Sequence, residues 1–170
     1  MSRTLRPLPY ERGYAEDMSG QIFRITELNP TLEMEIAKLL GSEGLEGRYS
    51  PGCDLYGIFD SDSTLAGITG AREFKTECLL HFVAVKEPER GEGIGTALVS
   101  RVLAHASSNC SSVWLFADQG STGYFERFGF EPVASDRIPE RIRGSQDISG
   151  IEIASTKVMT LLLPESWPSI

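Results

Sequence analysis

The sequence predicts a mixed α/β domain in which a sheet of six or seven strands is flanked by helices, and three observations support this fold class. Short segments with the alternating or continuous apolar pattern of strands recur along the chain. Three other segments repeat apolar residues at helical spacing. The apolar run at residues 79–85 passes through a charged turn into a glycine-rich helix start. With 170 residues and 41% hydrophobic content, the chain suits one domain with a sizeable core.

The first half of the chain is expected to form a strand, a helix and a hairpin. Residues 21–28 alternate between two sets of side chains, as a first strand does. Asn29 and Pro30 are favourable at a helix start, and Gly41 ends the helical pattern that follows. One face of that helix is apolar and is expected to be core: Leu32, Ile36, Leu39 and Leu40. The next two strands are joined by a short polar turn as a hairpin, residues 55–59 and 65–74.

The second half alternates strands with helices. A helix is expected over residues 94–106, because its apolar side chains share one stripe. A buried strand follows at residues 112–117, and then a short helix that ends at Gly129, a natural left-handed cap. The polar stretch 135–155 is compatible with a lid or with a plain hairpin loop. The last two expected strands lie on either side of that stretch, at residues 130–134 and 157–163.

Composition and charge exclude several classes of protein. The 24 acidic and 16 basic residues give a formal charge of -8, which argues against a nucleic-acid partner. No apolar run reaches the ~18 residues of a membrane span, and the first residues lack the apolar core of a signal peptide. Cys53, Cys78 and Cys110 are widely spaced and no histidine cluster accompanies them, so we expect no metal. These features favour a reduced, cytoplasmic protein without a membrane partner.

Residues 21–164 are expected to form this single domain. Residues 1–20 carry two prolines and many charges without apolar periodicity, which predicts a poorly ordered arm. Residues 165–170 are expected to be a short tail. The exposed edges of the predicted sheet are compatible with a homodimer.

The segment from Leu79 to Thr96 carries the strongest functional pattern. Glycines at alternate positions open a helix, where unpaired N–H groups at the positive end of the dipole favour an anion. A P-loop needs a lysine directly after its last glycine, where Thr96 stands. A dinucleotide fingerprint needs a third glycine three residues after its second, and neither register supplies one. The turn is therefore a different phosphate cradle, or only a tight connection.

The run Arg90-Gly91-Glu92-Gly93-Ile94-Gly95 resembles the pyrophosphate loop of the GCN5-related N-acetyltransferase (GNAT) family. Upstream, Val83-Ala84-Val85 matches the fourth strand of the family, and downstream, Tyr124 to Phe130 matches its late helix with a Gly-Phe exit. The resemblance implies a mostly antiparallel central sheet and acetyl-CoA as cosubstrate. Backbone N–H groups of Gly91 to Thr96 would then bind the pyrophosphate, and Val83 to Val85 would pair with the pantetheine like an added strand.

Acetyl transfer to an amine also needs an acid for the leaving thiolate and a base for the ammonium. The family often places a tyrosine directly before the glutamate of its late helix; here Phe125 has that position and the tyrosine is Tyr124. Tyr124 is the candidate acid, with packing against the sheet as the alternative. His81 and Glu77 are the candidate bases, because alternation from Val83 puts both on one strand face. A hydrogen-bonded core role is the alternative for His81.

The residues after the late helix look like the branch of the family that acetylates amino acids or their analogues. The acidic residue that this branch carries early in the fourth strand is replaced by Leu79, which argues against glutamate itself. An amino-acid acceptor needs a carboxylate clamp, and the candidates are Arg48, Arg72 and Arg143. Tyr49 adjoins Arg48, in a loop that can equally be solvated surface.

Other functions stay open at the level of sequence. The acidic surface also suits polyamines and aminoglycosides as acceptors, and a protein amine is a further alternative. A second class of function is a module that retains coenzyme A as a sensor without turnover. A third is a structural domain whose glycine-rich loop holds nothing.

Overall fold

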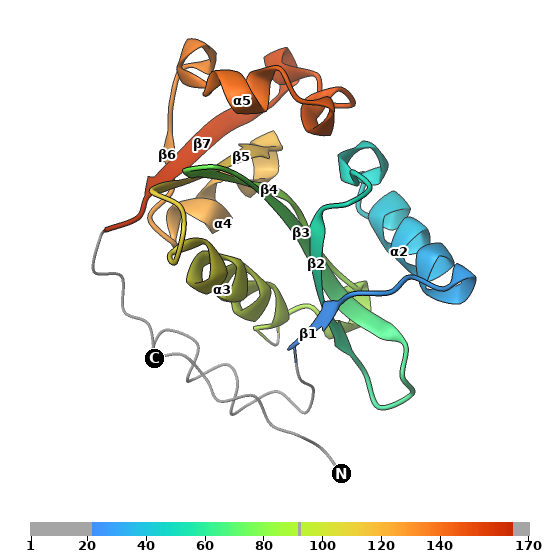
Figure 1. Cartoon of the computed structure of the whole chain (residues 1–170). Coiled ribbons are helices and arrows are strands. Elements are labelled where there is room, and N and C mark those ends of the chain that lie inside the picture. The colour runs from blue at the N-terminus through green and yellow to red at the C-terminus, as the bar shows by residue number, and fades with distance from the viewer. Residues whose placement is uncertain (1–21, 92, 165–170) are drawn as a thin grey trace.

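The computed structural model describes residues 22–91 and 93–164. They form a seven-stranded sheet of order β1-β2-β3-β4-β5-β7-β6, antiparallel at every pair except β4 and β5 (Figure 1). The strands are β1 (Ile22–Ile25), β2 (Asp54–Phe59), β3 (Leu65–Phe74), β4 (Glu77–Val85), β5 (Ser112–Ala117), β6 (Glu131–Pro132) and β7 (Lys157–Leu162). The helices are α2 (Pro30–Ser42), α3 (Ile94–Ala106), α4 (Thr122–Glu126) and α5 (Glu140–Arg143). In the two described ranges, no helix is long and apolar enough to cross a membrane.

This architecture confirms the predicted mixed α/β class with a mostly antiparallel sheet. The expected arm at residues 1–20 and the expected tail at residues 165–170 lie outside the described residues.

The local pattern around Asn29 and Pro30 starts α2 as predicted. The Oδ1 atom of Asn29 accepts a hydrogen bond from the backbone N–H of Leu32 at 2.8 Å, and Pro30 begins the helix. The predicted apolar face is core, with three side chains buried: Ile36, Leu39 and Leu40. The helix ends at Ser42, one residue beyond the predicted glycine stop.

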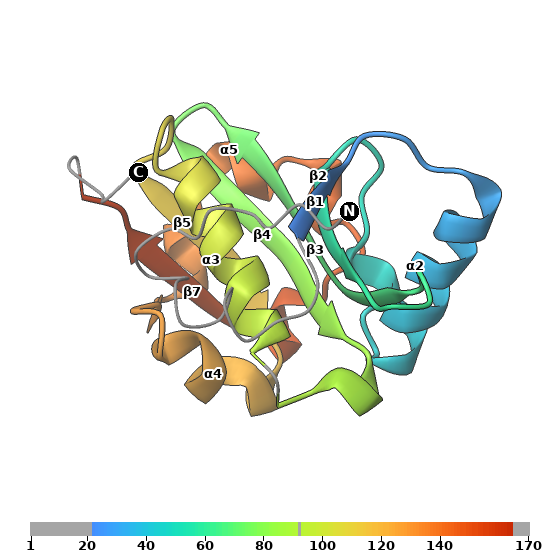
Figure 2. The same cartoon turned by 90° about the horizontal axis from the view of Figure 1, so that it is seen from below.

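Helices cover both faces of the sheet (Figure 2). α3 and α4 pack on one face, and α2 and α5 pack on the other. The predicted apolar stripe of α3 is buried along its whole length: Ile94, Leu98, Val99, Val102, Leu103 and Ala106. The central strands are therefore covered on both sides, which is why β4 and β5 are almost continuously apolar.

A bulge interrupts β4 at His81. Gly70 of β3 pairs with Phe82, and the next residue, Ala71, pairs with Leu80. His81 is the extra residue that this register leaves over. A bulge bends its strand and re-aims the side chains on either side of it.

The bulge reverses the alternation of side chains along β4. Val83 packs on the α3 side of the sheet, whereas Leu79 lies in the core beneath α5. The prediction that Glu77, Leu79, His81 and Val83 share one face is therefore wrong, because the extra residue shifts the pleat by one.

β4 and β5 separate soon after they meet. Their parallel pairing runs from Glu77 with Ser112 to Leu79 with Trp114. Beyond these pairs the described strands continue without pairing to each other, while β5 stays paired with β7 on its other side. The two central strands therefore diverge toward their carboxyl ends.

The connection between β6 and β7, residues 133–156, packs on the sheet. It contains α5 and three short 3-10 segments, including η5 (Gln146–Ile148). Three of its isoleucines are buried against the aromatic side chains of β5: Ile138, Ile142 and Ile148. The sequence predicted either a lid or a hairpin loop for this polar stretch. In the structure, residues 133–156 form a cap that packs on the sheet.

Candidate active site

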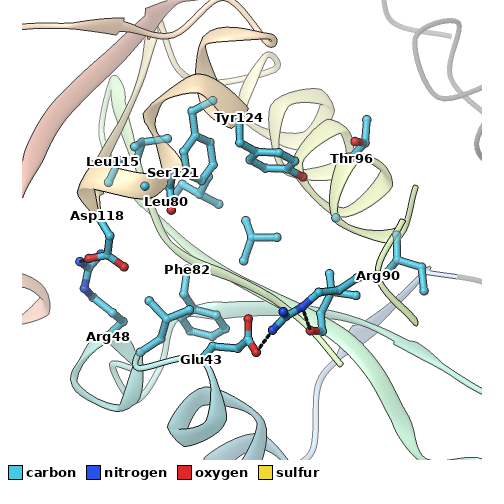
Figure 3. A pocket seen from close by; sticks show the side chains of 18 of the residues that line it. Glu43, Arg48, Leu80, Phe82, Arg90, Thr96, Leu115, Asp118, Ser121 and Tyr124 are labelled. Carbon is cyan, nitrogen blue, oxygen red and sulfur yellow. Dashed lines mark hydrogen bonds and ion pairs between the residues drawn. The ribbon is translucent and has the colours of Figure 1, made fainter. Parts of the chain in front are cut away.

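A cavity of about 610 Å³ lies where β4 and β5 diverge (Figure 3). Its walls come from the segment just after α2, η1 (Glu46–Arg48), the second half of β4, the turn into α3, the end of β5 and α4. It brings the glycine-rich turn together with Arg48 and Tyr124, which are distant in the sequence. Its charged lining residues are Glu43, Arg48, Glu89, Arg90, Asp118 and Arg127.

The glycine-rich turn forms one side of the cavity. Gly91 and Gly93 have φ angles of +87° and +82°, in the left-handed region that favours glycine. Gly93 is the N-cap residue of α3, and in the described part of the chain no side chain caps this N-terminus. The first N–H groups of α3, from Ile94 to Thr96, are therefore available to an anionic ligand. Glu92 lies outside the described residues.

Arg90 lies on the same side of the cavity as the glycine-rich turn. Its Nη2 donates to Oε2 of Glu43 just beyond α2, and its Nε donates to the carbonyl oxygen of Val85 at 3.3 Å (Figure 3). The Glu43 side chain is 19% exposed and the Arg90 side chain is 49% exposed. The pair places a carboxylate where the phosphates of a ligand would approach Arg90.

Tyr124 packs on the first turn of α3. A Cβ atom at Gly95 would lie 2.6 Å from the hydroxyl oxygen of Tyr124, so any larger residue there requires a shift. Phe125 and Phe128 meet the Tyr124 ring edge to face, with centroid distances of 5.1 and 5.5 Å. Gly95 therefore makes room for Tyr124.

The second half of β4 supplies both wall and strand edge. Val83 and Val85 line the cavity, whereas Ala84 points into the core beneath α2. The backbone of this part of β4 is hydrogen-bonded to β3 on one side, and β5 has diverged from its other side. A strand edge of this kind can pair with an extended ligand.

Arg48 faces the cavity from the side opposite Arg90 (Figure 3). Its Nη1 donates to the carbonyl oxygen of Phe116 at 2.6 Å, and its Nη2 donates to Oδ1 of Asp118 at 3.1 Å. Burial lowers the pKa of Arg48, and the Asp118 carboxylate opposes that effect. A guanidinium has five N–H donors, so Arg48 keeps donors for a further acceptor.

His81 belongs to the cavity wall, and its ring faces Asp147 of η5. The Nε2 atom of His81 lies 3.3 Å from Oδ1 of Asp147, and the His81 side chain is 1% exposed. The Nε atom of Arg72 lies 3.0 Å from Oδ1 and 2.9 Å from Oδ2 of the same carboxylate. Three charged or titratable side chains from β3, β4 and η5 therefore meet behind the wall.

Burial and the neighbouring charges act in opposite directions on this cluster. Burial lowers the pKa of His81, and the contact with Asp147 raises it again in part. Burial by itself would raise the pKa of Asp147, but hydrogen bonds from Ser50 and His81 and the charge of Arg72 hold that pKa below its ordinary value. At neutral pH the imidazole is neutral and the carboxylate is ionised.

One group of side chains away from the cavity has metal-ligand geometry. Asp54, Glu73 and His105 have ligating atoms within 4.8 Å of one another. Asp54 is already paired with Arg24 at 2.9 Å, and His105 Nε2 lies 3.6 Å from Glu73 Oε2. The contact with Arg24 already compensates part of the negative charge that would attract a cation.

The acetyltransferase (GNAT) family matches residues 27–130, which is over half of the chain. The chain belongs to the GNAT family. This confirms the family predicted from the loop around Arg90, and with it the enzyme class, an acetyl-CoA-dependent N-acetyltransferase. A comparison with curated proteins finds none that matches.

Solved acetyltransferase structures are similar in fold. N-acetylglutamate synthase from Neisseria gonorrhoeae, complexed with coenzyme A and N-acetylglutamate, is 17% identical with a TM-score of 0.65 over 86% of this chain. This chain spans only 36% of that longer synthase chain. Tetrahymena GCN5 is 17% identical with a TM-score of 0.63, covering 89% of this chain and 100% of its own. The ribosomal-protein-S18-alanine N-acetyltransferase from Escherichia coli is 12% identical with a TM-score of 0.60, covering 89% and 98%.

Several predicted site residues of this GNAT protein converge on the cavity. Arg48, His81 and Tyr124 line it, together with the loop from Arg90 to Thr96 apart from Glu92. Glu77 does not line it. That residue begins β4 at the end opposite Val85, hydrogen-bonds with Thr76 and lies 3.5 Å from Arg141.

Two of the three predicted carboxylate-clamp arginines also lie outside the cavity lining. Arg72 is held by Asp147, and its Nη2 donates to the carbonyl oxygen of Pro51 at 2.8 Å. Arg143 donates to the carbonyl oxygen of Ser135. Of the three, Arg48 is the arginine that a ligand in the cavity can reach.

Sequence reasoning missed three acidic residues of the site: Glu43, Asp118 and Asp147. Asp118 directly follows a predicted strand, and that position was a usable pointer to a site residue. Glu43 and Asp147 offer no local pattern, because their hydrogen bonds to Arg90 and Arg72 span 47 and 75 positions of the chain.

Proposed function

We propose that this acetyltransferase transfers the acetyl group of acetyl-CoA to the primary amine of a small molecule, an amino acid or an analogue of one. The observation that carries the proposal is the cavity between β4 and β5, with the N-terminus of α3 on one side and Arg48 on the other (Figure 3). A thioester held from the first side and an amine held from the second would meet between the diverging strands.

The phosphate side suits coenzyme A. The N–H groups at the start of α3 and the glycines at positions 91 and 93 would bind the pyrophosphate, and Arg90 would pair with it. The pantetheine would lie along the edge of β4 from Val83 to Val85, where β5 no longer pairs. These contacts use backbone groups, so the apolar side chains there are no obstacle.

In this proposal Tyr124 protonates the leaving thiolate and His81 accepts the proton of the ammonium. A phenol and a thiol differ in pKa by only about 1.5 units, so proton transfer between them is feasible. Glu77 is assigned no catalytic role, because it begins β4 far from the cavity and is paired with Arg141. Replacing Tyr124 by Phe is expected to lower kcat by about tenfold or more, with acetyl-CoA affinity retained.

Arg48 is the proposed partner of the acceptor carboxylate. It lines the cavity, it is 11% exposed, and two of its nitrogens are already oriented by Phe116 and Asp118. A guanidinium fixed in this way loses little freedom when it binds a carboxylate. The Asp118 carboxylate, which is 56% exposed, lies beside it and can attract the ammonium of the same acceptor.

The test is release of free coenzyme A from acetyl-CoA with four panels of amines: amino acids, polyamines, aminoglycosides and peptides. Turnover with amino acids supports the proposal. Turnover confined to another panel would replace the acceptor class while keeping the enzyme. Acetyl-CoA binding without turnover on any panel would favour a coenzyme A sensor.

Replacing Arg48 by Lys tests the carboxylate contact. The KM of the amino acid is expected to rise by about tenfold, the size of a lost charged hydrogen bond, while the KM of acetyl-CoA stays within about twofold. Arg24→Lys is the matched control, because Arg24 also pairs with an aspartate but lies away from the cavity. Equal KM values in the two variants would remove Arg48 from acceptor recognition.

A further inference from the structure

We propose that Asp147, held by Arg72, positions His81 and stabilises its protonated form, so that the three side chains act as one proton-accepting unit for the acceptor amine. The inference rests on the proposed function, and it adds two positioning residues to the base. Asp147 and Arg72 touch no reactant themselves.

The first support is the geometry of the three side chains. Asp147 is buried, its Oδ1 is 3.3 Å from His81 Nε2, and both of its oxygens lie within 3.0 Å of Arg72 Nε. The Asp147 carboxylate therefore has a charged partner, Arg72, on one side and a neutral imidazole on the other, which becomes a second charged partner only when His81 takes a proton. At 3.3 Å from Asp147, Nε2 is the nitrogen that carries the hydrogen in the tautomer that we infer, and Nδ1, which is also buried, is the nitrogen that would take a proton.

The second support is the place of His81 in the fold. It is the bulged residue of β4, just beyond the point where β5 stops pairing, and it belongs to the cavity wall. Bulges re-aim side chains next to active sites. Because the ring is only 1% exposed and both of its nitrogens are buried, bulk solvent does not reach them, and transfer from the acceptor requires a water molecule that bridges the cavity and the ring.

The third support is the way in which the cap holds Asp147. Ile148, the next residue, is buried beneath α5. Close by in the chain, the backbone of Gly150 meets that of Gly47: a Cβ atom on Gly150 would lie 2.7 Å from the carbonyl oxygen of Gly47. The cap is therefore fixed on both the sheet and the segment that carries Arg48, which restricts where the Asp147 carboxylate can lie.

The groups around His81 suit a base that must alternate between two charge states. Burial and the charge of Arg72 lower the pKa of His81, so the imidazole is neutral and can accept a proton. Asp147 and the backbone carbonyl of Gly70 favour the imidazolium once it forms. Burial raises the pKa of Cys53, which interacts electrostatically with Asp147, to about 11, so that thiol stays neutral.

The reaction balances in protons with these groups. The acceptor ammonium gives one proton to His81, and the neutral amine attacks the thioester carbonyl carbon. The C–N bond forms, the C–S bond breaks, and the thiolate takes a proton from Tyr124. The second proton lost by the nitrogen restores Tyr124, and His81 returns its proton to water, so one amide, one thiol and one solvent proton result.

The chain has two histidines, His81 and His105, so imidazole NMR can test the unit without any substrate. The ¹⁵N shifts of His81 at pH 8 are expected to show the Nε2–H tautomer. Asp147→Asn should lower the midpoint of the His81 titration, because it removes the charge that favours the imidazolium. Arg72→Gln should raise that midpoint, because it removes the opposing charge.

Asp136→Asn is the matched control, since Asp136 lies exposed in the same cap. A His81 midpoint and tautomer that are the same in the Asp147→Asn and Asp136→Asn proteins would overturn the inference. If the Asp147→Asn protein does not fold, the Arg72→Gln protein decides alone: a His81 titration midpoint equal to that of the unmodified protein would overturn the inference.

Kinetics separate this inference from the proposed function. Once an acceptor amine has been identified, Asp147→Asn should lower kcat by about tenfold or more. It should also move the acid limb of the plot of kcat against pH to lower pH. The thermal shift by acetyl-CoA should stay as in the unmodified protein. Loss of kcat without movement of the acid limb means a structural role and overturns the inference, whereas an unmodified protein that releases no coenzyme A overturns the proposed function.

Discussion

Arg90 of the glycine-rich turn is already bonded to an acid of its own chain, because its Nη2 donates to Oε2 of Glu43. The pair joins the end of α2 to the turn before α3. If Arg90 binds the phosphates of coenzyme A, as proposed, Glu43 would compete with the cosubstrate for this guanidinium.

Replacing Glu43 by Gln is therefore expected to tighten acetyl-CoA binding. The pair is partly exposed, so its loss is worth up to about 1 kcal/mol, or about two- to fivefold in Kd. Isothermal titration calorimetry measures the change, with Glu33→Gln on the exposed face of the same helix as control. Weaker binding in the Glu43 variant would show that Glu43 orients Arg90 for the phosphates.

A second prediction concerns the close approach of Gly95 and Tyr124. Gly95→Ala puts a methyl group 2.6 Å from the Tyr124 hydroxyl oxygen, and overpacking of this kind costs about 1–3 kcal/mol. In a Tyr124→Phe background the nearest ring atom is 3.6 Å away, so most of that loss should be absent. Urea unfolding of the two single variants and the double variant measures the coupling.

Gly123→Ala is the control for this cycle, because a Cβ atom there meets nothing within 4 Å. Its free energy of unfolding should be unchanged or slightly raised, since alanine favours the helix. Additive losses for Gly95→Ala and Tyr124→Phe would contradict the packing account.

A third prediction tests the N-terminus of α3 as the phosphate site. Gly93 has a φ angle of +82°, which asparagine and aspartate both tolerate better than other side chains do. Gly93→Asp should bind acetyl-CoA at least about tenfold more weakly than Gly93→Asn, because the two variants differ only in the charge set against the pyrophosphate. Equal thermal shifts with acetyl-CoA would place the phosphates elsewhere.

A fourth prediction is a dependence of stability on pH that comes from His81. Its pKa is lowered in the folded protein, so below pH ~6.5 the unfolded chain binds a proton that the native state does not. The free energy of unfolding should therefore fall as the pH drops from ~6.5 toward 5. His81→Gln should flatten this part of the curve in urea unfolding series, and an unchanged slope would show that His81 protonates in the folded state as readily as in the unfolded one.

Asp147 also makes the free energy of unfolding depend on pH, but as an acid that is ionised in the native state. Its pKa is lowered in the native state, so its stabilising contribution is present above the ordinary pKa of ~3.9 and is lost as the pH falls through the native value. Asp147→Asn should therefore lose stability at pH 7 and differ less from the unmodified protein near pH 3. A difference that is the same at both pH values would mean that packing alone is responsible.

The sequence by itself determined the features that depend on neighbours along the chain. Asn29 and Pro30 start α2, the alternating hairpin strands pair as β2 and β3, and the glycines before Ile94 open α3. Caps, strand periodicity and turn residues act over a few positions, so they can be recognised without the fold. The family follows from the same local pattern around Arg90.

Only the tertiary structure decided what surrounds the reacting groups. The bulge at His81 depends on how β4 pairs with β3. Because of it, Leu79 and Val83 lie on opposite faces of the sheet and not on the one face that was predicted. Asp147 reaches His81 only because the isoleucines of the cap pack on β5, and Glu43 reaches Arg90 only because α2 packs beneath β4. Such contacts join residues far apart in the chain through burial and strand register, and neither quantity exists until the sheet and its helices have packed.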